Sequence, residues 1–439
     1  MGILELAIPA MISSLSGLIT VLICIRLLGQ ADAHNYYLLA VFLPINYVMI
    51  AIYESMRSAS LTLSSLDAYQ GKLDKISLNI ASLIIALAII FIAFLFLLLI
   101  LSQQVGHWVG VIAAEQQTFI MFSSIMLTSG IVTGMVYVFT STFFAMKKPL
   151  VGMSVTLSSA FLTCLLTSYF VRFIAPTWLS YVLGSLIACI FCLLVSLILM
   201  QRQGVFLFFD GFARIGLVIN NLTPIMKVGM PVLLSLLVIF SSLFIINSTL
   251  SYFNPSILTG YSIAYRVQNV VILPAITIGT AIAILSSKAR AEGDRKEEHF
   301  IQSTGLAICF LFYILLSGLI YYFRDNVMAL VTANVELIHA GSIYLKTVAL
   351  TYVCMGPNLA YLTLLEQSGF GCKSFFINVP YFLFAVGIGC MAAIHYQHYE
   401  YLYITIAITN ILFFVYILLL VGIKLQRANQ LNLVRLRDV

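Results

Sequence analysis

Four ionisable side chains of this sequence stand inside long apolar runs, where an unbalanced charge is costly. In the run at residues 38–65, Glu54 and Arg57 are three positions apart, so on a helix they face the same side, and Tyr47 extends that face. At this depth a carboxylate can bind and release a proton or another ion while Arg57 restrains its charge. The pair can equally be a static ion pair that fixes the helix to its neighbours. Both interpretations stay open, and Glu54 and Arg57 are the ion-coupling candidates.

The other two deep charges are basic. Arg266 and Lys346 leave an excess of positive charge over Glu54, although Arg266 could also reach a membrane surface along its own aliphatic stem. Together with Tyr47 and Tyr352, they are candidates for lining a substrate-binding cleft. A basic cleft favours an anionic or zwitterionic ligand over a lipophilic cation.

A fifth charge lies nearer the end of an apolar run. Glu366 is followed seven residues later by Lys373. We expect Glu366 to cap or pair at that end, for instance with Lys373.

The composition identifies the class of protein that must position these side chains. Of 439 residues, 62% are hydrophobic and 9% are charged, with a mean hydropathy of +1.07. A soluble chain carries about a quarter charged residues, and a run of roughly 20 apolar residues is enough to cross a bilayer. The sequence therefore predicts an all-α integral membrane protein. Its twelve expected spans are 3–28, 38–65, 78–102, 117–145, 149–173, 177–200, 223–249, 257–287, 299–323, 334–366, 373–396 and 400–424.

The chain contains an internal repeat with an offset of 222 residues. In that register Pro9 meets Pro231, Gly71 meets Gly293, and a Leu-Ser-Ser tripeptide recurs. We therefore predict two pseudo-symmetric lobes of six helices at 1–200 and 223–424, a cytoplasmic interlobe linker at 201–222, and a basic cytoplasmic tail at 425–439. An even number of spans in each lobe gives the repeats one orientation, a layout used for transport by alternating access.

Lysine and arginine placement predicts the orientation. Connections on one side of the membrane, together with the tail, hold most of the basic residues, and such an excess marks the cytoplasmic face. We therefore expect both termini to be cytoplasmic and the protein to lie in the inner (plasma) membrane. The basic residues on that side are Lys72, Lys75, Lys147, Lys148, Arg202, Arg214, Lys227, Lys288, Arg290, Arg295, Lys296, Lys373, Lys424, Arg427, Arg435 and Arg437.

Three prolines fall inside predicted spans. Pro44, Pro274 and Pro357 each remove a backbone donor and can bend a helix. They are the candidate kink positions for a gating motion.

Several segments together resemble a known family. Gly229-Met230-Pro231 opens the seventh span. Ala264-Tyr265-Arg266, Leu273-Pro274 and Gly293-Asp294 mark the eighth span and the loop after it. Short turns join the fourth span to the fifth at Phe144–Pro149 and the tenth to the eleventh at Gly369–Lys373. These features resemble the multidrug and toxic compound extrusion (MATE) family of the MOP flippase superfamily. The resemblance implies a twelve-helix secondary transporter of two lobes.

The sequence departs from the family at its acidic positions. Where members often carry ion-coupling acids, this chain has Val21 in the first span, Ile239 in the seventh and Pro357 in the tenth, and the polar pair of the fifth span falls at Ala160 and Cys164. The usual coupling residues therefore do not transfer to this chain.

These observations predict a secondary active exporter of a small amphiphilic compound, a proton-coupled antiporter, with sodium as the other ion that could couple transport. We expect a monomer in the lipid bilayer, with no enzymatic activity, cofactor, metal site or nucleic-acid partner. One alternative is a flippase for a lipid-linked precursor, which a basic cleft would also suit. A second is a degenerate member that binds a ligand without transporting it. A membrane-embedded enzyme would need a cluster of His, Asp or Glu, and the apolar runs contain none.

Overall fold

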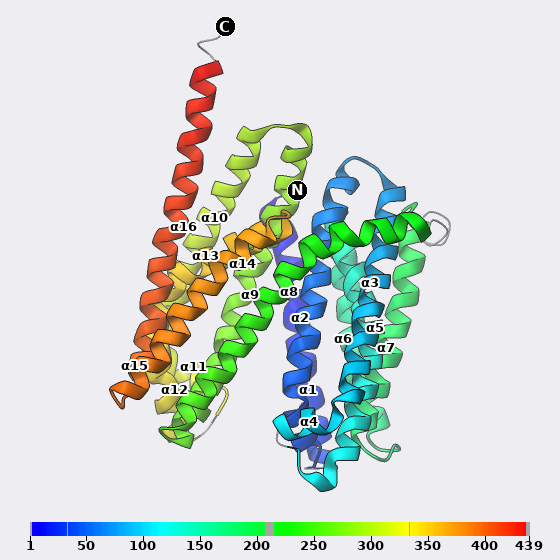
Figure 1. The fold of residues 1–439 in the computed structure, drawn as a ribbon, viewed down its shortest axis with the longest axis vertical. Coiled ribbons are helices and arrows are strands. Elements are labelled where there is room, and N and C mark those ends of the chain that lie inside the picture. Colours follow the sequence, from blue (N-terminus) through cyan, green and yellow to red (C-terminus); the bar gives the residue numbers. More distant parts are fainter. Residues whose placement is uncertain (1, 33, 110, 207–214, 333, 436–439) are drawn as a thin grey trace. The chain divides into compact units, whose positions relative to one another are not determined.

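The computed structural model describes residues 2–32, 34–109, 111–206, 215–332 and 334–435, with backbone alone for residues 34, 36, 215 and 421–435. The described chain is helical (Figure 1). The α-helices are α1 (Ile3–Ala31), α2 (His34–Tyr69), α3 (Leu73–Ile100), α4 (Ser102–Trp108), α5 (Gln116–Ala145), α6 (Pro149–Phe170), α7 (Trp178–Arg202), α8 (Ile215–Ser251), α9 (Pro255–Glu292), α10 (Arg295–Tyr322), α11 (Arg324–Ala329), α12 (Val335–Val348), α13 (Tyr352–Gln367), α14 (Gly371–Phe382), α15 (Gly389–His395) and α16 (Glu400–Arg435).

Twelve segments of the described chain are long and apolar enough to cross a membrane. They coincide with the twelve predicted spans, so the predicted fold class is confirmed. Two of the spans are composite. The tenth joins α12 to α13 through a 3-10 turn at Ala349–Thr351, and the eleventh joins α14 to α15 through a π-helical segment at Leu383–Ile388.

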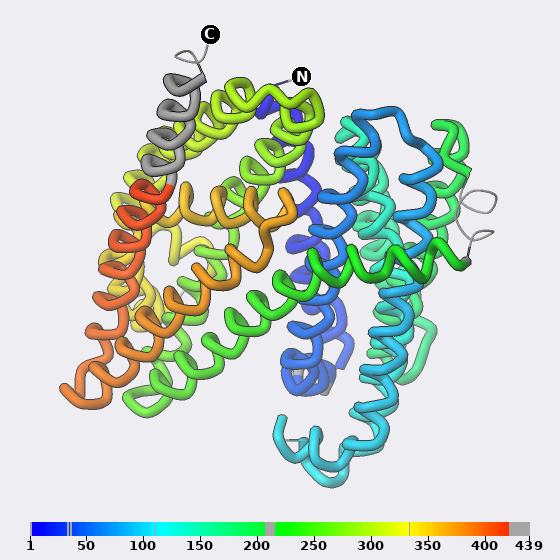
Figure 2. Tube along the Cα trace, turned by 45° about the horizontal axis from the view of Figure 1, so that its top comes forward, coloured from blue at the N-terminus to red at the C-terminus, as the bar shows by residue number. Residues whose placement is uncertain are grey.

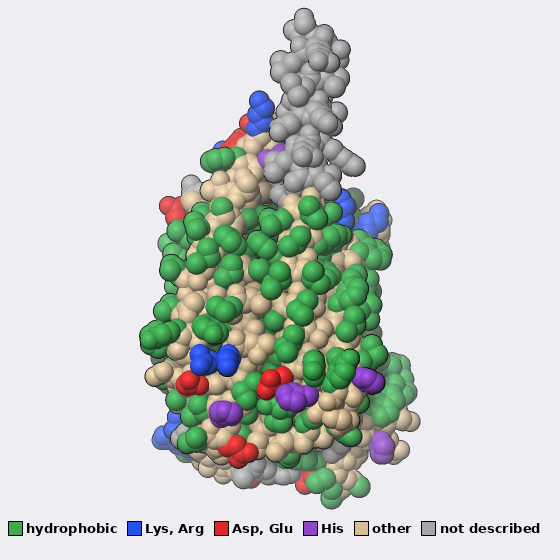
Figure 3. Space-filling view, turned by 90° about the vertical axis from the view of Figure 1, so that its left-hand side faces the viewer, with side chains coloured by type: hydrophobic (Ala, Val, Ile, Leu, Met, Phe, Trp, Pro, Cys, Tyr) green, Lys and Arg blue, Asp and Glu red, His purple; other side chains and the backbone are tan. Residues whose placement is uncertain are grey.

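The outer surface is that of a membrane protein. Figure 3 shows one face covered mainly by hydrophobic and other uncharged side chains, with a group of basic, acidic and histidine side chains from its middle downward and further basic side chains near its top. Large apolar side chains stand fully outward on several helices, including Phe96, Phe161 and Leu315, each about two-thirds exposed or more. Soluble proteins rarely expose such continuous apolar surface, so these helices face lipid.

The internal repeat is visible in the backbone as well as in the sequence. Gly71 and Gly293, 222 residues apart, have φ of +68° and +74°. At the next pair in the same register, Lys147 and Gly369 have φ of +57° and +83°. Both members of each pair follow a long helix. Matching helices of the two repeats therefore end at a residue with the same left-handed backbone conformation.

We expect Gly293→Ala to lower the free energy of unfolding by about 1 kcal/mol, because an L-residue pays roughly that much in the left-handed region. No heavy atom lies within 4 Å of the Cβ that alanine would add, so the effect comes from the backbone alone. Thermal unfolding in detergent would measure it. Gly17→Ala is the matched control, since Gly17 is inside α1 with equally open surroundings. An equal loss of stability in both variants would contradict this explanation.

The chain divides into two compact units. The first comprises Met1–Leu237, Thr280–Gln302 and Leu364–Phe375, and the second comprises Val238–Gly279, Ser303–Thr363 and Phe376–Val439. In the first unit α2 and α3 pack against α5, and α6 packs against both α1 and α7 (Figure 1). In the second, α12 and α15 pack on α16. The division into lobes at 1–200 and 223–424 stays a prediction.

The predicted linker and tail are more helical than expected. α8 begins at Ile215, so residues 215–222 of the linker are already part of a helix, while 207–214 lie outside the described residues. Figure 2 shows α8 as a continuous tube from this point. At the other end, α16 continues to Arg435, well into the predicted tail. Residues 425–435 contain neither Gly nor Pro and several good helix formers, which explains why the helix continues. Residues 436–439 lie outside the description.

Candidate functional site

The Glu54–Arg57 pair on α2 is formed as the three-residue spacing predicts. The Arg57 guanidinium donates a hydrogen bond to Glu54 Oε2 at 3.0 Å. The Arg57 side chain is 14% exposed and the Glu54 side chain 36% exposed. Arg57 is thus held inside the unit while Glu54 remains accessible. An accessible carboxylate can exchange a proton or an ion without the helix unfolding.

An aromatic stack from three helices lies beside this pair. Tyr53 of α2 stacks between Phe91 of α3 and Tyr137 of α5, with ring centroids 5.5 and 5.2 Å away. Tyr53 is buried, whereas Tyr137 is 38% exposed. Tyr137 also lies close enough to Glu54 and Arg57 to interact with both electrostatically. Sequence analysis missed Tyr137, because nothing in a helix of small and apolar residues shows which side faces α2.

Tyr47 and the three prolines keep the placements that the sequence suggested. Tyr47 is half-buried on α2, two turns before Glu54. Pro44, Pro274 and Pro357 lie inside α2, α9 and α13. Their roles in substrate contact and gating remain predictions.

Glu366 lies in the last turn of α13, and its partner differs from the expected one. Its Oε1 accepts a hydrogen bond from the Ser374 hydroxyl of α14 at 2.8 Å. Its carbonyl oxygen lies 3.4 Å from the Thr62 hydroxyl of α2. The suggested pair with Lys373 does not form, because the Lys373 ammonium stands 4.7 Å from the centre of the Phe370 ring instead. Figure 2 shows the sharp corner between α13 and α14 at which these residues meet.

Arg290 of α9 is engaged at the same corner. It forms an ion pair with Glu298 at 2.9 Å and donates to the Ser368 carbonyl at 3.2 Å. Its guanidinium carbon also stands 5.9 Å from the centre of the Phe370 ring. Phe370 therefore contacts two cations, Arg290 and Lys373. Both contacts are favourable because the face of an aromatic ring is electronegative and attracts a cation.

The motif segments meet in this part of the first unit. A Cβ at Gly229 would lie 3.0 Å from the Ser55 hydroxyl of α2, and a Cβ at Gly371 would lie 3.3 Å from the Val228 carbonyl and 3.4 Å from Pro231. These glycines therefore allow α8 to approach α2 and the α13–α14 corner closely. Three of the residues that carry the resemblance, Gly229, Pro231 and Gly371, thus lie at helix crossings.

A further contact joins α2 to α9 and to the turn after α5. The Tyr69 hydroxyl donates to the Glu292 carboxylate, and the Lys147 ammonium stands 5.1 Å from the centre of the Tyr69 ring. Partial burial lowers the pKa of Lys147, and repulsion from Lys288 lowers it further, while Glu292 acts in the opposite direction. Lysines of the first and second repeats thus share one neighbourhood.

The second unit contains a neutral polar centre. Gln268 of α9 accepts hydrogen bonds from the Tyr344 hydroxyl at 2.5 Å and the Tyr352 hydroxyl at 3.3 Å. Both tyrosines are essentially fully buried. Tyr352 was predicted as a cleft residue beside Lys346, but here it faces Gln268. Sequence analysis missed Gln268, because a single amide among apolar residues gives no sign of its partners.

Arg266 and Lys346 stand apart from this centre. Both side chains are exposed, and neither forms a hydrogen bond or an ion pair with another residue that the structure describes. The sequence grouped them with Tyr352, and the structure leaves both side chains exposed, Arg266 on α9 and Lys346 on α12, while Tyr352 is buried. Their predicted role in substrate contact is not tested by this placement.

We expect Tyr344→Phe to lower the free energy of unfolding by about 1 kcal/mol, the usual net value of a buried hydrogen bond. The shape of the core is kept, and Gln268 retains Tyr352 as a donor. Chemical denaturation in detergent would measure the change. Tyr416→Phe is the control, since Tyr416 is 46% exposed on α16. Equal effects in the two variants would show that the Gln268 contact contributes nothing.

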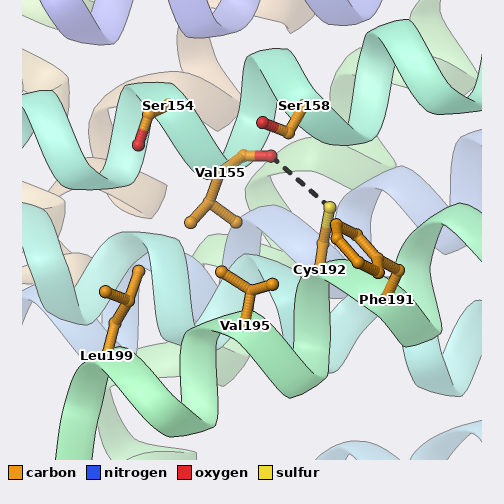
Figure 4. Close-up of a pocket in the computed structure, with 7 residues that line it drawn as sticks. All are labelled: Ser154, Val155, Ser158, Phe191, Cys192, Val195 and Leu199. Carbon is orange, nitrogen blue, oxygen red and sulfur yellow. Dashed lines mark hydrogen bonds between the residues drawn. The ribbon is translucent and has the colours of Figure 1, made fainter.

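A small groove of about 70 Å³ lies between α6 and α7. Figure 4 shows the α6 side of the groove, formed by Ser154, Val155 and Ser158, and the α7 side, formed by Phe191, Cys192, Val195 and Leu199. The Cys192 thiol lies 3.7 Å from the Val155 carbonyl oxygen. Its walls are largely apolar and carry no ionisable group other than the cysteine. It offers no counterpart to the charges of α2.

The residues described form no group of three or more His, Cys, Asp or Glu that could hold a metal ion. The ionisable groups are instead dispersed through a bundle of membrane-spanning helices.

Comparison with known proteins defines the class. The family model MatE matches residues 231–391. Among curated protein sequences, none gives a significant match. Solved structures share the fold along nearly the whole chain. A MATE protein in complex with MaL6 has a TM-score of 0.87 at 16% identity, over 98% of this chain and 96% of its own.

Two further structures agree. A MOP superfamily transporter from Pyrococcus furiosus gives a TM-score of 0.85 at 16% identity, covering 97% of this chain and 95% of its own. The Vibrio cholerae MATE transporter VcmN in its bent form gives 0.84 at 17% identity, covering 98% and 97%. The fold is therefore that of the MOP superfamily transporters. The chain resembles the MATE transporters in its fold and in the family model matched by residues 231–391, and it is a multi-pass integral membrane protein.

Proposed function

We propose that this protein is a secondary active exporter that moves a small amphiphilic compound out of the cytoplasm in exchange for protons. The observation that carries the proposal is the Glu54–Arg57 pair, a partly exposed carboxylate with a single cationic partner in the middle of a membrane-spanning helix. An intramembrane ionisable group of this kind is costly, which favours a functional role. Tyr137 beside it adds an accessible aromatic surface for an amphiphilic ligand.

The proton is the proposed coupling ion. A sodium ion at Glu54 would have to compete with the Arg57 guanidinium for the same carboxylate. Protonation instead neutralises Glu54 and releases Arg57 without any further ligand. A change in the Arg57 contact can then alter the packing of α2 against its neighbours.

The proposed substrate is anionic or zwitterionic. Three basic side chains within spans, Arg57, Arg266 and Lys346, outnumber Glu54, and the latter two stand exposed. The Pyrococcus furiosus transporter of the same fold is described as having a binding pocket of reversed polarity and a different function. Such a variation within one fold supports a substrate other than a lipophilic cation.

We also propose that both termini are cytoplasmic and that the protein lies in the inner membrane. Lys147 lies in the turn after α5, and Lys288 and Arg290 lie near the end of α9. Contacts within the first unit bring these segments of different repeats together around Tyr69 and Phe370. Clustering of basic residues at one end supports the positive-inside orientation. Labelling of single cysteines placed at residues 288 and 254 from either side of the membrane tests it. Labelling of residue 288 from the outside of intact cells would reverse the assignment.

The function is tested by transport into proteoliposomes with an imposed pH gradient. The probes are tetraphenylphosphonium as a cation, taurocholate as an anionic amphiphile, and a polyprenyl phosphate. We expect pH-driven movement of taurocholate and its loss in Arg57→Gln and Lys346→Gln. Transport of tetraphenylphosphonium alone, or unchanged taurocholate transport in both variants, would overturn the substrate assignment.

Two other outcomes would favour the alternatives. Transfer of the polyprenyl phosphate between leaflets would favour a flippase of the same superfamily. Thermal stabilisation by a probe that is never transported would favour a binding protein, since a ligand that binds only the folded state raises its stability.

A further inference from the structure

We propose that Glu366 is a second proton-binding group of the transporter, which passes the coupled proton to the aqueous side at the α13–α14 corner. This inference rests on the proposed proton coupling and adds a group that the sequence did not distinguish. It requires that the Glu366 carboxyl stays without a counter-charge although cations lie close by.

The two cations described at the α13–α14 corner, Arg290 and Lys373, have other partners. Arg290 is bound by Glu298 and by the Ser368 carbonyl, and its guanidinium carbon lies 5.9 Å from the centre of the Phe370 ring. Lys373 lies against the same ring. Among the residues that the structure describes, the Glu366 side chain has Ser374 as its hydrogen-bond partner and forms no ion pair. Phe370 thus holds both cations away from the acid.

The local backbone also disfavours a negative charge on Glu366. The residue lies in the last turn of α13, where unpaired carbonyl groups give the helix end a partial negative charge. The acid that acts on Glu366 electrostatically from α2 is Glu54, and repulsion between two carboxylates favours a proton on one of them. The Ser374 hydroxyl donates to Oε1, and a neutral carboxyl group can accept such a bond through its carbonyl oxygen.

The position of Glu366 connects it to the rest of the proposed path. Its carbonyl oxygen lies 3.4 Å from the hydroxyl of Thr62, which follows Glu54 by eight residues on α2, or about 12 Å along the helix. A proton released from the Glu54 carboxyl can cross this interval through water and bind the Glu366 carboxylate. Glu366 then loses it to water when α2 and the corner separate. One O–H bond breaks and one forms at each transfer, so no other reactant is needed.

Infrared difference spectroscopy of the full-length protein in lipid vesicles tests the protonation directly and needs no substrate. Spectra are compared between about pH 5 and about pH 9. An ordinary glutamate, with a pKa of about 4.3, is mostly ionised over this whole range. We expect the wild type to show a carboxylic-acid C=O band that persists to neutral pH. Glu366→Gln should remove this band, and Glu336→Gln should leave it in place.

Glu366→Asp keeps the proposal testable if the glutamine variant does not fold. The aspartate should retain a carboxylic-acid band at a shifted frequency and restore most pH-driven transport. An unaltered band in Glu366→Gln, or a wild type without any such band at neutral pH, would overturn the proposal. Persistence of the Glu366 band in a protein that shows no pH-driven transport of any probe would instead overturn the proposed function, and the proton site would stand.

Discussion

Replacing Glu54 with glutamine is expected to lower pH-gradient-driven transport at least about tenfold, equivalent to about 1.4 kcal/mol in the rate-limiting barrier. The amide cannot take up or release a proton, but its oxygen can still accept the Arg57 hydrogen bond that the carboxylate accepts now. The fold should therefore survive while coupling is lost. Initial rates in proteoliposomes with and without a pH gradient measure the effect.

Glu336→Gln provides the matched control for this substitution. Glu336 is an exposed residue in the first turn of α12, and its replacement removes the same charge without touching the α2 pair. Transport should change less than about twofold. Unchanged pH-driven transport in Glu54→Gln would assign the pair a static structural role and remove the main support for proton coupling.

The largest expected loss of stability comes from adding one methyl group at Gly279 on α9. In Gly279→Ala the new Cβ would lie 2.5 Å from the Ala360 carbonyl oxygen and 2.9 Å from Thr363 Cβ, both on α13. Backbone cannot rotate away as a long side chain can, so the two helices must separate. Overpacking of this kind costs about 1–3 kcal/mol, which exceeds the helix-propensity gain of up to about 1 kcal/mol. Thermal unfolding in detergent should show a clear drop in melting temperature.

Gly318→Ala separates the steric effect from helix propensity. Gly318 lies inside α10, and no heavy atom stands within 4 Å of its prospective Cβ. Because alanine is the better helix former, this variant should be as stable as the wild type or more stable by up to about 1 kcal/mol. A similar loss in both alanine variants would mean that the α9–α13 crossing is not tightly packed.

Helix positions and the repeat were predictable because their causes are local. The number and placement of spans depend on runs of apolar residues, which the sequence displays directly. The repeat was found from matches such as Gly71 with Gly293, and the structure gives both glycines the same left-handed backbone. The Glu54–Arg57 contact also followed from spacing on a single helix, where geometry is fixed by the helical rise.

The composition of the candidate site was less predictable. The sequence paired Glu366 with Lys373 on proximity along the chain, but the α13–α14 corner directs Lys373 onto Phe370 and Glu366 toward Ser374. It also grouped Tyr352 with Lys346, although helical geometry turns one side chain inward and the other outward. Two residues close in sequence can face opposite sides of a helix, and which side is buried depends on partners elsewhere in the chain.

The amino-acid order was sufficient to establish a twelve-helix duplicated membrane protein and a charged pair on its second span. Hydropathy and helical periodicity are properties of neighbouring residues along the chain. Because a membrane-spanning helix satisfies its backbone hydrogen bonds within itself, these local properties are sufficient to predict where a span lies. The contacts of Glu366 with α2 and α14, the stack of Tyr137 on Tyr53, and the Gln268 centre join residues from 8 to more than 300 positions apart. Such contacts depend on how side chains on neighbouring helices interdigitate, and packing of this kind exists only once the helices have assembled.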